Sequence, residues 1–211
     1  MLKVVCTRII ALLVLPGILM AARGCYAIGE RDPVATITFS DGGRIKVKLY
    51  PEYAPNTVAN FISLANSGFY ENSPVHRIEE YFVIQMGMSA SGNDLDYTIA
   101  GEFPDNGYKS NELTHDFGTI SMARRVGDPD SKEYRDSASS QFFICTTNQP
   151  ALNGSYAAFG KIYEESGFDE LVKISRMDVN SNGEPRDEIY IVSVEVNTYG
   201  KDYGEPEKII D

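Results

Sequence analysis

Two polar side chains, Arg77 and Gln85, lie in stretches that are otherwise apolar enough to be buried. Arg77 belongs to residues 75–78 and Gln85 to residues 82–87, with a short polar connection between them. A buried arginine is costly unless something pairs with it. The pattern therefore predicts two strands on which both side chains line a cleft while their neighbours face the core. Arg77 offers a hydrogen-bond donor that stays charged at any working pH, and Gln85 offers both a donor and an acceptor.

Five motifs extend this pattern along the chain. They are VHRI at residues 75–78, FVIQMG at 82–87, GTISMA at 118–123, SQFFICT at 140–146 and ALNGSYAAFGKI at 151–162. In this order and at this spacing they resemble the cyclophilin family of peptidyl-prolyl isomerases, over roughly residues 33–199. Any one motif alone would be a weak signal, whereas the ordered set is a strong one.

The resemblance implies a mainly β fold, a closed antiparallel eight-stranded barrel capped by two α-helices. The residue pattern also favours a barrel, because many short strands can avoid exposed edges by closing on themselves. Strands are predicted over residues 34–39, 44–50, 118–123, 141–146, 157–163 and 189–196, beside those of Arg77 and Gln85. One helix is expected to begin at Pro55 and stop at Gly68, and a second to span residues 167–177. Residues 124–139 are expected to form a polar loop.

For activity, the resemblance implies faster rotation about the peptide bond that precedes proline. This rotation is slow because resonance gives the C–N bond partial double-bond character, with a barrier of ~18–20 kcal/mol. A donor aimed at the prolyl nitrogen would stabilise the twisted state more than either planar state, which is the condition for catalysis. The motif match implies that the catalytic residues are Arg77, Gln85 and Phe82. It implies that the substrate-binding residues are Val83, Ala123, Arg124, Phe143, Leu152 and Tyr156.

Two further interpretations of these residues stay open. Arg77 could be a structural arginine paired with Glu79 or Glu80. Separately, the chain could be a proline-segment binding module or chaperone with little isomerase activity. Binding alone would not need the arginine, so its presence favours the enzyme. Cys145 lies in a strongly apolar segment, and we expect it to pack in the core rather than act as a nucleophile.

The pocket residues depart from the family pattern at several positions. Val83 stands where methionine is usual, Arg124 where asparagine is common, and Tyr156 where many members have histidine. Ala151 stands where the family often has tryptophan or phenylalanine, and the chain contains no tryptophan. In the family that aromatic residue helps to hold the cyclic peptide cyclosporin. We therefore expect weak cyclosporin binding together with retained isomerase activity.

The N-terminus is typical of an exported protein. Two basic residues precede an apolar segment, residues 9–22, that is shorter than the ~20 residues a spanning helix needs. This predicts a signal peptide within residues 1–25. Its end, Ala-Arg-Gly-Cys, resembles a bacterial lipobox with an atypical arginine, which makes Cys25 a candidate lipidation site and the protein a candidate membrane lipoprotein. The alternative is plain secretion with an incidental Cys25.

Length and charge limit the remaining possibilities. The 211 residues suffice for one domain with a full core: a tether at 26–32, the isomerase domain at 33–199, and an acidic, loosely ordered tail at 200–211. The net charge of −11 argues against nucleic acid or an anionic membrane as the main partner. The expected partners are proline-containing polypeptides, with membrane contact only through an N-terminal lipid, no cofactor, and a monomer by default. Residues 178–183 begin like a calcium loop, but Ile189 stands where its bidentate acid belongs, so no metal site is expected.

Overall fold

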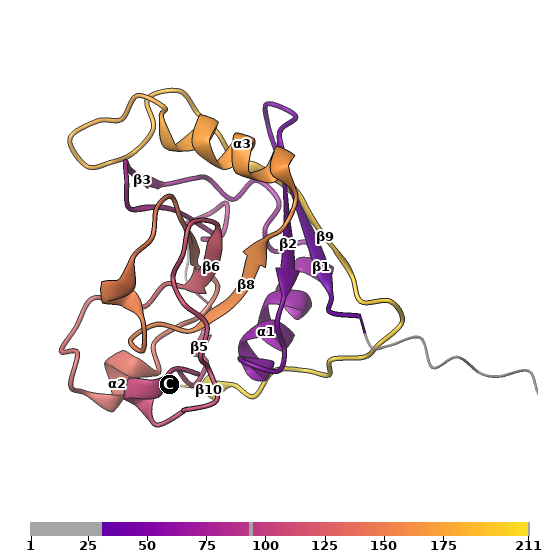
Figure 1. Cartoon of the computed structure of the whole chain (residues 1–211), viewed down its shortest axis with the longest axis vertical. Helices are drawn as coiled ribbons and strands as arrows, with labels where there is room; N and C mark the ends of the chain where they lie inside the picture. Colours follow the sequence, from indigo (N-terminus) through magenta and orange to yellow (C-terminus); the bar gives the residue numbers. More distant parts are fainter. Residues whose placement is uncertain (1–30, 93–94, 211) are drawn as a thin grey trace, which may run out of the picture. The chain divides into compact units, whose positions relative to one another are not determined.

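Eight strands form one antiparallel sheet in the computed structural model, which describes residues 31–92 and 95–210 (Figure 1). They are β1 (Val34–Phe39), β2 (Arg44–Leu49), β3 (Arg77–Glu79), β4 (Val83–Met86), β6 (Thr119–Met122), β7 (Phe142–Cys145), β8 (Ala158–Ile162) and β9 (Ile191–Asn197). Each strand lies within two residues of its predicted range. The predicted signal peptide, Cys25 and most of the tether lie outside the described residues.

The sheet does not close, which corrects the expected closed barrel. The strand order is β3-β4-β7-β6-β8-β2-β1-β9, so β3 and β9 are its two edges. Chain segments beside these edges do meet: Val75 donates its backbone N–H to Ile189 over 3.0 Å, and Pro74 forms an isolated bridge with Tyr190. A continuous ladder fails here because β3 has only three residues and Pro74 has no N–H to donate. The result is a strongly curved, open sheet (Figure 1).

Helix α1 (Pro55–Asn66) buries the apolar face predicted for it and stops before Gly68, whose φ is +74°. Its N-terminus is capped from a distance. The residue at the N-cap, Ala54, has no polar side chain, and Glu102 supplies the acceptors instead. The carboxylate of Glu102 accepts the backbone N–H of Asn56 over 3.0 Å and that of Thr57 over 2.7 Å. This buried carboxylate satisfies donors that a helix leaves unpaired and favourably faces its dipole.

The second predicted helix is α3 (Glu165–Ser175), which begins two residues earlier than expected. Figure 1 shows α1 and α3 at opposite ends of the sheet. A short third helix, α2 (Lys132–Arg135), lies within the segment predicted to be a polar loop. The described part of the chain therefore has three α-helices rather than two. None of its helices has the length and apolar character that crossing a membrane would require.

The C-terminal segment is not loosely ordered, contrary to expectation. Its last strand, β10 (Ile209–Ile210), pairs antiparallel with β5 (Tyr97–Thr98). Before this strand, the side chain of Asn56 on α1 accepts the N–H of Glu207 over 2.7 Å and donates to its carbonyl over 3.0 Å. Composition suggested a free acidic tail, but these backbone partners, distant in sequence, fix its course.

Side chains of the sheet pack into two separate apolar clusters. The larger one is the core, which holds Phe142 of β7. The smaller one contains Val83, Ala123, Phe143 and Cys145, with Phe82, Leu152 and Tyr156 packed against it. Successive residues of a strand point to opposite faces, so Phe142 and Phe143 separate into different clusters. The sequence left open which phenylalanine faces the core, and the family match assigned Phe143 to the pocket. The structure confirms that assignment.

Candidate active site

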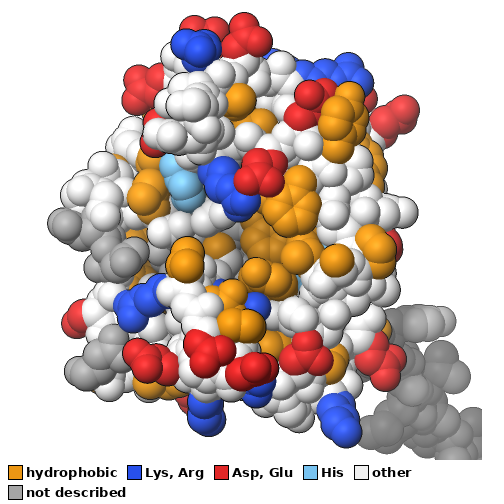
Figure 2. Space-filling model, turned by 90° about the vertical axis from the view of Figure 1, so that its left-hand side faces the viewer, with side chains coloured by type: hydrophobic (Ala, Val, Ile, Leu, Met, Phe, Trp, Pro, Cys, Tyr) orange, Lys and Arg blue, Asp and Glu red, His pale blue; other side chains and the backbone are white. Residues whose placement is uncertain are grey.

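All nine residues predicted for the site line one cavity of about 70 Å³. They are Arg77, Phe82, Val83, Gln85, Ala123, Arg124, Phe143, Leu152 and Tyr156. Figure 2 shows hydrophobic side chains gathered near the centre of one face of the molecule, beside a basic and an acidic side chain in contact. The cavity thus combines an apolar interior with charged groups at its edge.

The apolar part of the cavity comes from neighbouring strands and one short turn. Val83 of β4 is 2% exposed and Phe143 of β7 is 5% exposed. Both sit on the same face because β4 and β7 are antiparallel neighbours, with Val83 opposite Cys145 and Gln85 opposite Phe143. A 3-10 turn (Pro150–Leu152) brings Leu152 against them. Such a small hollow with apolar walls suits a compact hydrocarbon ring.

Arg77 stands directly opposite Gln85 in the β3–β4 register. Its Nη1 donates to Gln85 Oε1 over 3.2 Å, while its Nε and Nη2 both donate to one oxygen of Glu79. Glu79 lies two residues along the strand and therefore shares a face with Arg77, whereas Glu80 does not. The structural alternative correctly anticipated an ion pair, and Glu79 is the partner.

This ion pair leaves Arg77 able to donate hydrogen bonds to a substrate. The Arg77 side chain is 36% exposed and that of Glu79 is 46% exposed. Exposed pairs of this kind contribute only about 0–1 kcal/mol. A guanidinium has five N–H groups, and the three contacts leave one N–H on each terminal nitrogen of Arg77 for another acceptor. Glu79 and Gln85 therefore orient the guanidinium without using all its donors.

Gln141 is a site residue that sequence reasoning missed. Its Oε1 accepts from Gln85 Nε2 over 3.0 Å, which fixes the amide that in turn holds Arg77. The signal was available, because Gln141 lies two residues before Phe143 and so shares its face. Gln85 and Arg77 belong to the cavity lining, and Gln141 supports them from outside it.

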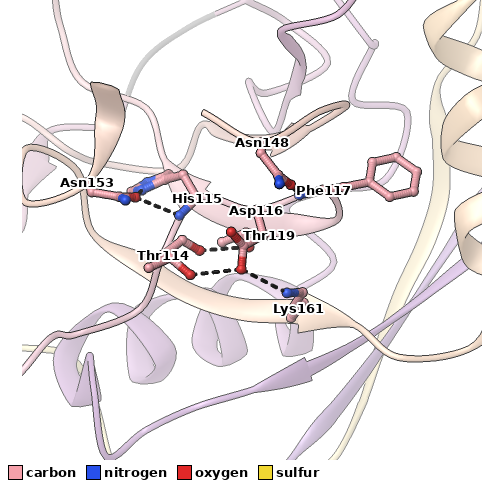
Figure 3. Close-up of polar contacts among 8 residues, drawn as sticks. All are labelled: Thr114, His115, Asp116, Phe117, Thr119, Asn148, Asn153 and Lys161. Carbon is pink, nitrogen blue, oxygen red and sulfur yellow. Dashed lines mark hydrogen bonds and ion pairs between the residues drawn. The ribbon is translucent and has the colours of Figure 1, made fainter. Parts of the chain in front are cut away.

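Behind the cavity, a buried histidine supports its wall. The His115 ring stacks on Phe143 with centroids 6.0 Å apart, and its Nε2 lies 3.1 Å from the hydroxyl of Ser121. Figure 3 shows His115 beside Asn153, whose Oδ1 accepts the His115 backbone N–H over 2.8 Å. In the same view Asp116 accepts from Thr114 over 2.8 Å and pairs with Lys161, contacts that fix the loop carrying His115.

Acid is expected to weaken the fold through this histidine. Burial lowers the pKa of His115, and burial likewise lowers that of His76, from the usual 6.5. A lowered folded-state pKa means that the unfolded chain binds the proton more readily. The stabilisation is therefore complete above pH 6.5 and declines as the pH falls from there toward the folded-state values. Denaturant unfolding at pH 7.5, 6.5 and 5.5 should show this decline.

The variant His115→Gln is expected to have a shallower decline in the free energy of unfolding over this range. His76→Gln serves as the matched variant and should remove the contribution of His76 to the pH dependence of the free energy of unfolding. The comparison uses the slope with pH rather than the absolute stability, so a general loss of packing does not confuse it. An unchanged slope in His115→Gln would contradict the assignment.

Cys145 packs in the interior, as predicted. Its side chain is fully buried, and burial raises the pKa of the thiol to about 12. A thiol with this pKa holds almost no thiolate at neutral pH, so it is a poor nucleophile. Its contribution is to the packing of the small cluster with Val83 and Phe143.

Comparison with known proteins identifies the class of this fold and site. Residues 34–196 match the family model of the cyclophilin type peptidyl-prolyl cis-trans isomerase/CLD. The chain belongs to this family, and it is an enzyme that catalyses cis-trans isomerisation of peptide bonds preceding proline.

The relatives include bacterial isomerases and a protozoan structure. Peptidyl-prolyl cis-trans isomerase B of Bacillus subtilis is 40% identical over 141 residues, covering 66% of this chain and 88% of the relative. A peptidyl-prolyl cis-trans isomerase of Helicobacter pylori is 35% identical over 164 residues, covering 73% of this chain and 90% of the relative. A crystal structure of a Cryptosporidium parvum cyclophilin type isomerase, in the presence of the dipeptide Ala-Pro, has a TM-score of 0.63 and 29% identity. The match covers 78% of this chain and 98% of the chain in the crystal structure.

Proposed function

We propose that isomerisation takes place in the 70 Å³ cavity, with Arg77 as the donor to the prolyl nitrogen. The observation that carries this proposal is the position of Arg77, at the edge of an apolar hollow and oriented by Gln85. As the peptide bond twists, its nitrogen becomes pyramidal and gains a lone pair. A cationic donor stabilises that state more than either planar one, and the apolar surroundings strengthen the interaction by lowering the effective dielectric constant.

The other residues hold the substrate in this mechanism. Phe82, Val83, Phe143 and Leu152 enclose the proline ring, and Gln85 holds the substrate backbone through its amide. Ala123 follows the end of β6. Its backbone N–H donates to the carbonyl of Gln141 over 2.9 Å, so its own carbonyl is the group that would pair with an extended peptide. The shared position of these residues in the cavity lining and the chemistry of each side chain support these proposed roles.

The test is the rate of cis-trans isomerisation of a short Ala-Pro peptide with and without the purified protein. Acceleration that saturates with peptide concentration supports catalysis at one site. Peptide binding without acceleration would instead support the proline-segment binding module or chaperone. A binding module would keep the apolar cavity lining, and the Arg77–Glu79 ion pair is compatible with a purely structural arginine in such a module.

Weak binding of cyclosporin is part of this proposal. Ala151 lies in the 3-10 turn beside the cavity and is exposed, so no large aromatic side chain stands there. We expect cyclosporin to inhibit isomerisation with a Kd above about 1 μM. Ala151→Trp should tighten binding by about tenfold or more, because it restores apolar area against the ligand. Sub-micromolar inhibition of the wild-type protein would contradict this prediction.

We also propose that the protein is exported, anchored by lipid at Cys25, and assists the folding of proteins outside the cytoplasm. The support is the order of the N-terminal residues: basic, then apolar, then the lipobox-like end. Expressed with its full N-terminus in a bacterial host, the wild type should fractionate with membranes, and Cys25→Ser should not. Equal release of both into the soluble extracytoplasmic fraction would favour plain secretion.

A further inference from the structure

Arg124 is held among three aromatic rings at the wall of the active-site cavity. Its guanidinium carbon lies 4.8 Å from the ring centroid of Phe103, 4.4 Å from that of Tyr134 and 4.3 Å from that of Tyr156. These distances are typical of cation–π contacts. We call Phe103, Tyr134 and Tyr156 the aromatic cage.

The cage is built by contacts that fix Tyr134. Helix α2 is capped by Ser131, whose Oγ accepts the backbone N–H of Tyr134 over 3.1 Å. At the other end of the helix, buried Asp136 accepts the N–H of Gly101 over 2.9 Å and pairs with Lys132. Gly101 lies two residues before Phe103, so the same contacts tie two walls of the cage together. The short helix missed by the sequence analysis therefore has a defined role in positioning Tyr134.

The positive charge of Arg124 has no acidic partner among the residues that the structure describes. Nearby cations differ in this respect: Arg77 pairs with Glu79. Lys132 pairs with Asp136. The Arg124 Nε is buried and has no hydrogen-bond partner. The residue as a whole is half-buried and lines the cavity, so part of its side chain is accessible from the cavity.

The rings of the cage interact with the charge of the guanidinium but do not replace hydrogen-bond acceptors for its N–H groups. Aromatic rings interact with the flat faces of the cation, while the N–H groups point outward in its plane and need acceptors there. Because Arg124 lines the same cavity as Arg77, a peptide seated in the cavity lies beside the Arg124 side chain. A carboxylate is the best match, since it can accept two parallel N–H bonds and neutralises the charge. In a protein of net charge −11, such a site offsets the general repulsion of acidic peptides.

We propose that Arg124 makes the enzyme selective for polypeptides that carry an acidic side chain within two residues of the proline. The carboxylate binds the in-plane N–H groups of the caged guanidinium. This inference rests on the proposed catalytic use of the cavity, and it assigns Arg124 a specificity role rather than a role in the rotation itself.

The test is a set of short peptides with one Xaa-Pro bond, in which Glu, Gln or Lys occupies in turn each of the two positions before and after the proline. For at least one position, the wild-type kcat/KM should be about five- to tenfold higher with Glu than with Gln, and lowest with Lys. Raising the salt concentration from about 20 to about 500 mM should reduce the ratio, because the paired charges are partly exposed.

In Arg124→Gln the Glu-to-Gln ratio should fall to about one, and Arg124→Lys should recover part of it through the charge alone. Arg44→Gln removes the same charge from an exposed position on β2 and should keep the wild-type ratio. Because each ratio is taken within one protein, a general loss of activity does not affect it. If Arg124→Gln fails to fold, the Glu-to-Gln ratio of kcat/KM in the wild type and its salt dependence still test the inference.

A wild-type enzyme that turns over Glu and Gln peptides equally would overturn the inference while leaving the isomerase intact. A Glu preference that persists in Arg124→Gln would also overturn it. Absence of isomerisation for every peptide would instead count against the proposed function. The two proposals can therefore fail separately.

Discussion

Replacing Arg77 with alanine is expected to lower kcat/KM for a short Xaa-Pro peptide by about 10²–10³-fold. A pre-oriented donor that meets charge developing in the transition state typically contributes this much. Arg77 fits that description because Gln85 and Glu79 hold its guanidinium at the cavity edge with two N–H groups unused. The isomerisation rate at matched, folded protein concentration measures the effect.

One further variant separates charge from geometry at Arg77, and a second variant serves as a control at an exposed arginine. Arg77→Lys keeps the positive charge but loses the planar fork, so it should recover only part of the activity. Arg44→Ala removes an exposed arginine from β2, away from the cavity lining, and should retain wild-type activity. Equal acceleration by Arg77→Ala and the wild type would preserve the enzyme but reject Arg77 as the donor.

The cavity was predictable from sequence because its residues lie in strands with fixed alternation. Arg77 and Gln85 share a face once their strands pair, and Phe143 joins them through β7. The family motifs then determined which face was the pocket, a choice that alternation alone could not make for Phe142 and Phe143. Every residue expected to line the site does so.

Features that depend on distant partners were not predictable in this way. Closure of the sheet failed at Pro74, where one missing N–H interrupts pairing between segments more than a hundred residues apart in sequence. The C-terminal strand is ordered by β5, and no pattern within the tail reveals that partner. Tyr134 looked like part of a solvated loop because its role appears only once Arg124 lies against it.

The neighbouring residues Phe142 and Phe143 are expected to give opposite phenotypes when each is replaced by alanine. Phe142 is fully buried and packs edge-on against Phe61 and Tyr70, with ring centroids 5.5 and 5.6 Å away. Removing a buried phenylalanine loses its transfer free energy and leaves a cavity, so Phe142→Ala should lower the free energy of unfolding by about 3–5 kcal/mol. Denaturant unfolding measures this loss.

Phe143→Ala should cost less stability and more activity, because Phe143 already borders an open cavity and forms part of its wall. Loss of this wall should lower kcat/KM by about tenfold or more, since the proline ring would bury less apolar area. Phe142→Ala, assayed where it remains folded, should keep most of its activity because its ring belongs to the core behind the sheet. Similar stability losses and similar activity losses in the two variants would contradict the assignment of their faces. That assignment also fixes the register of β7 against β4, because a slip by one residue would exchange the positions of the two rings.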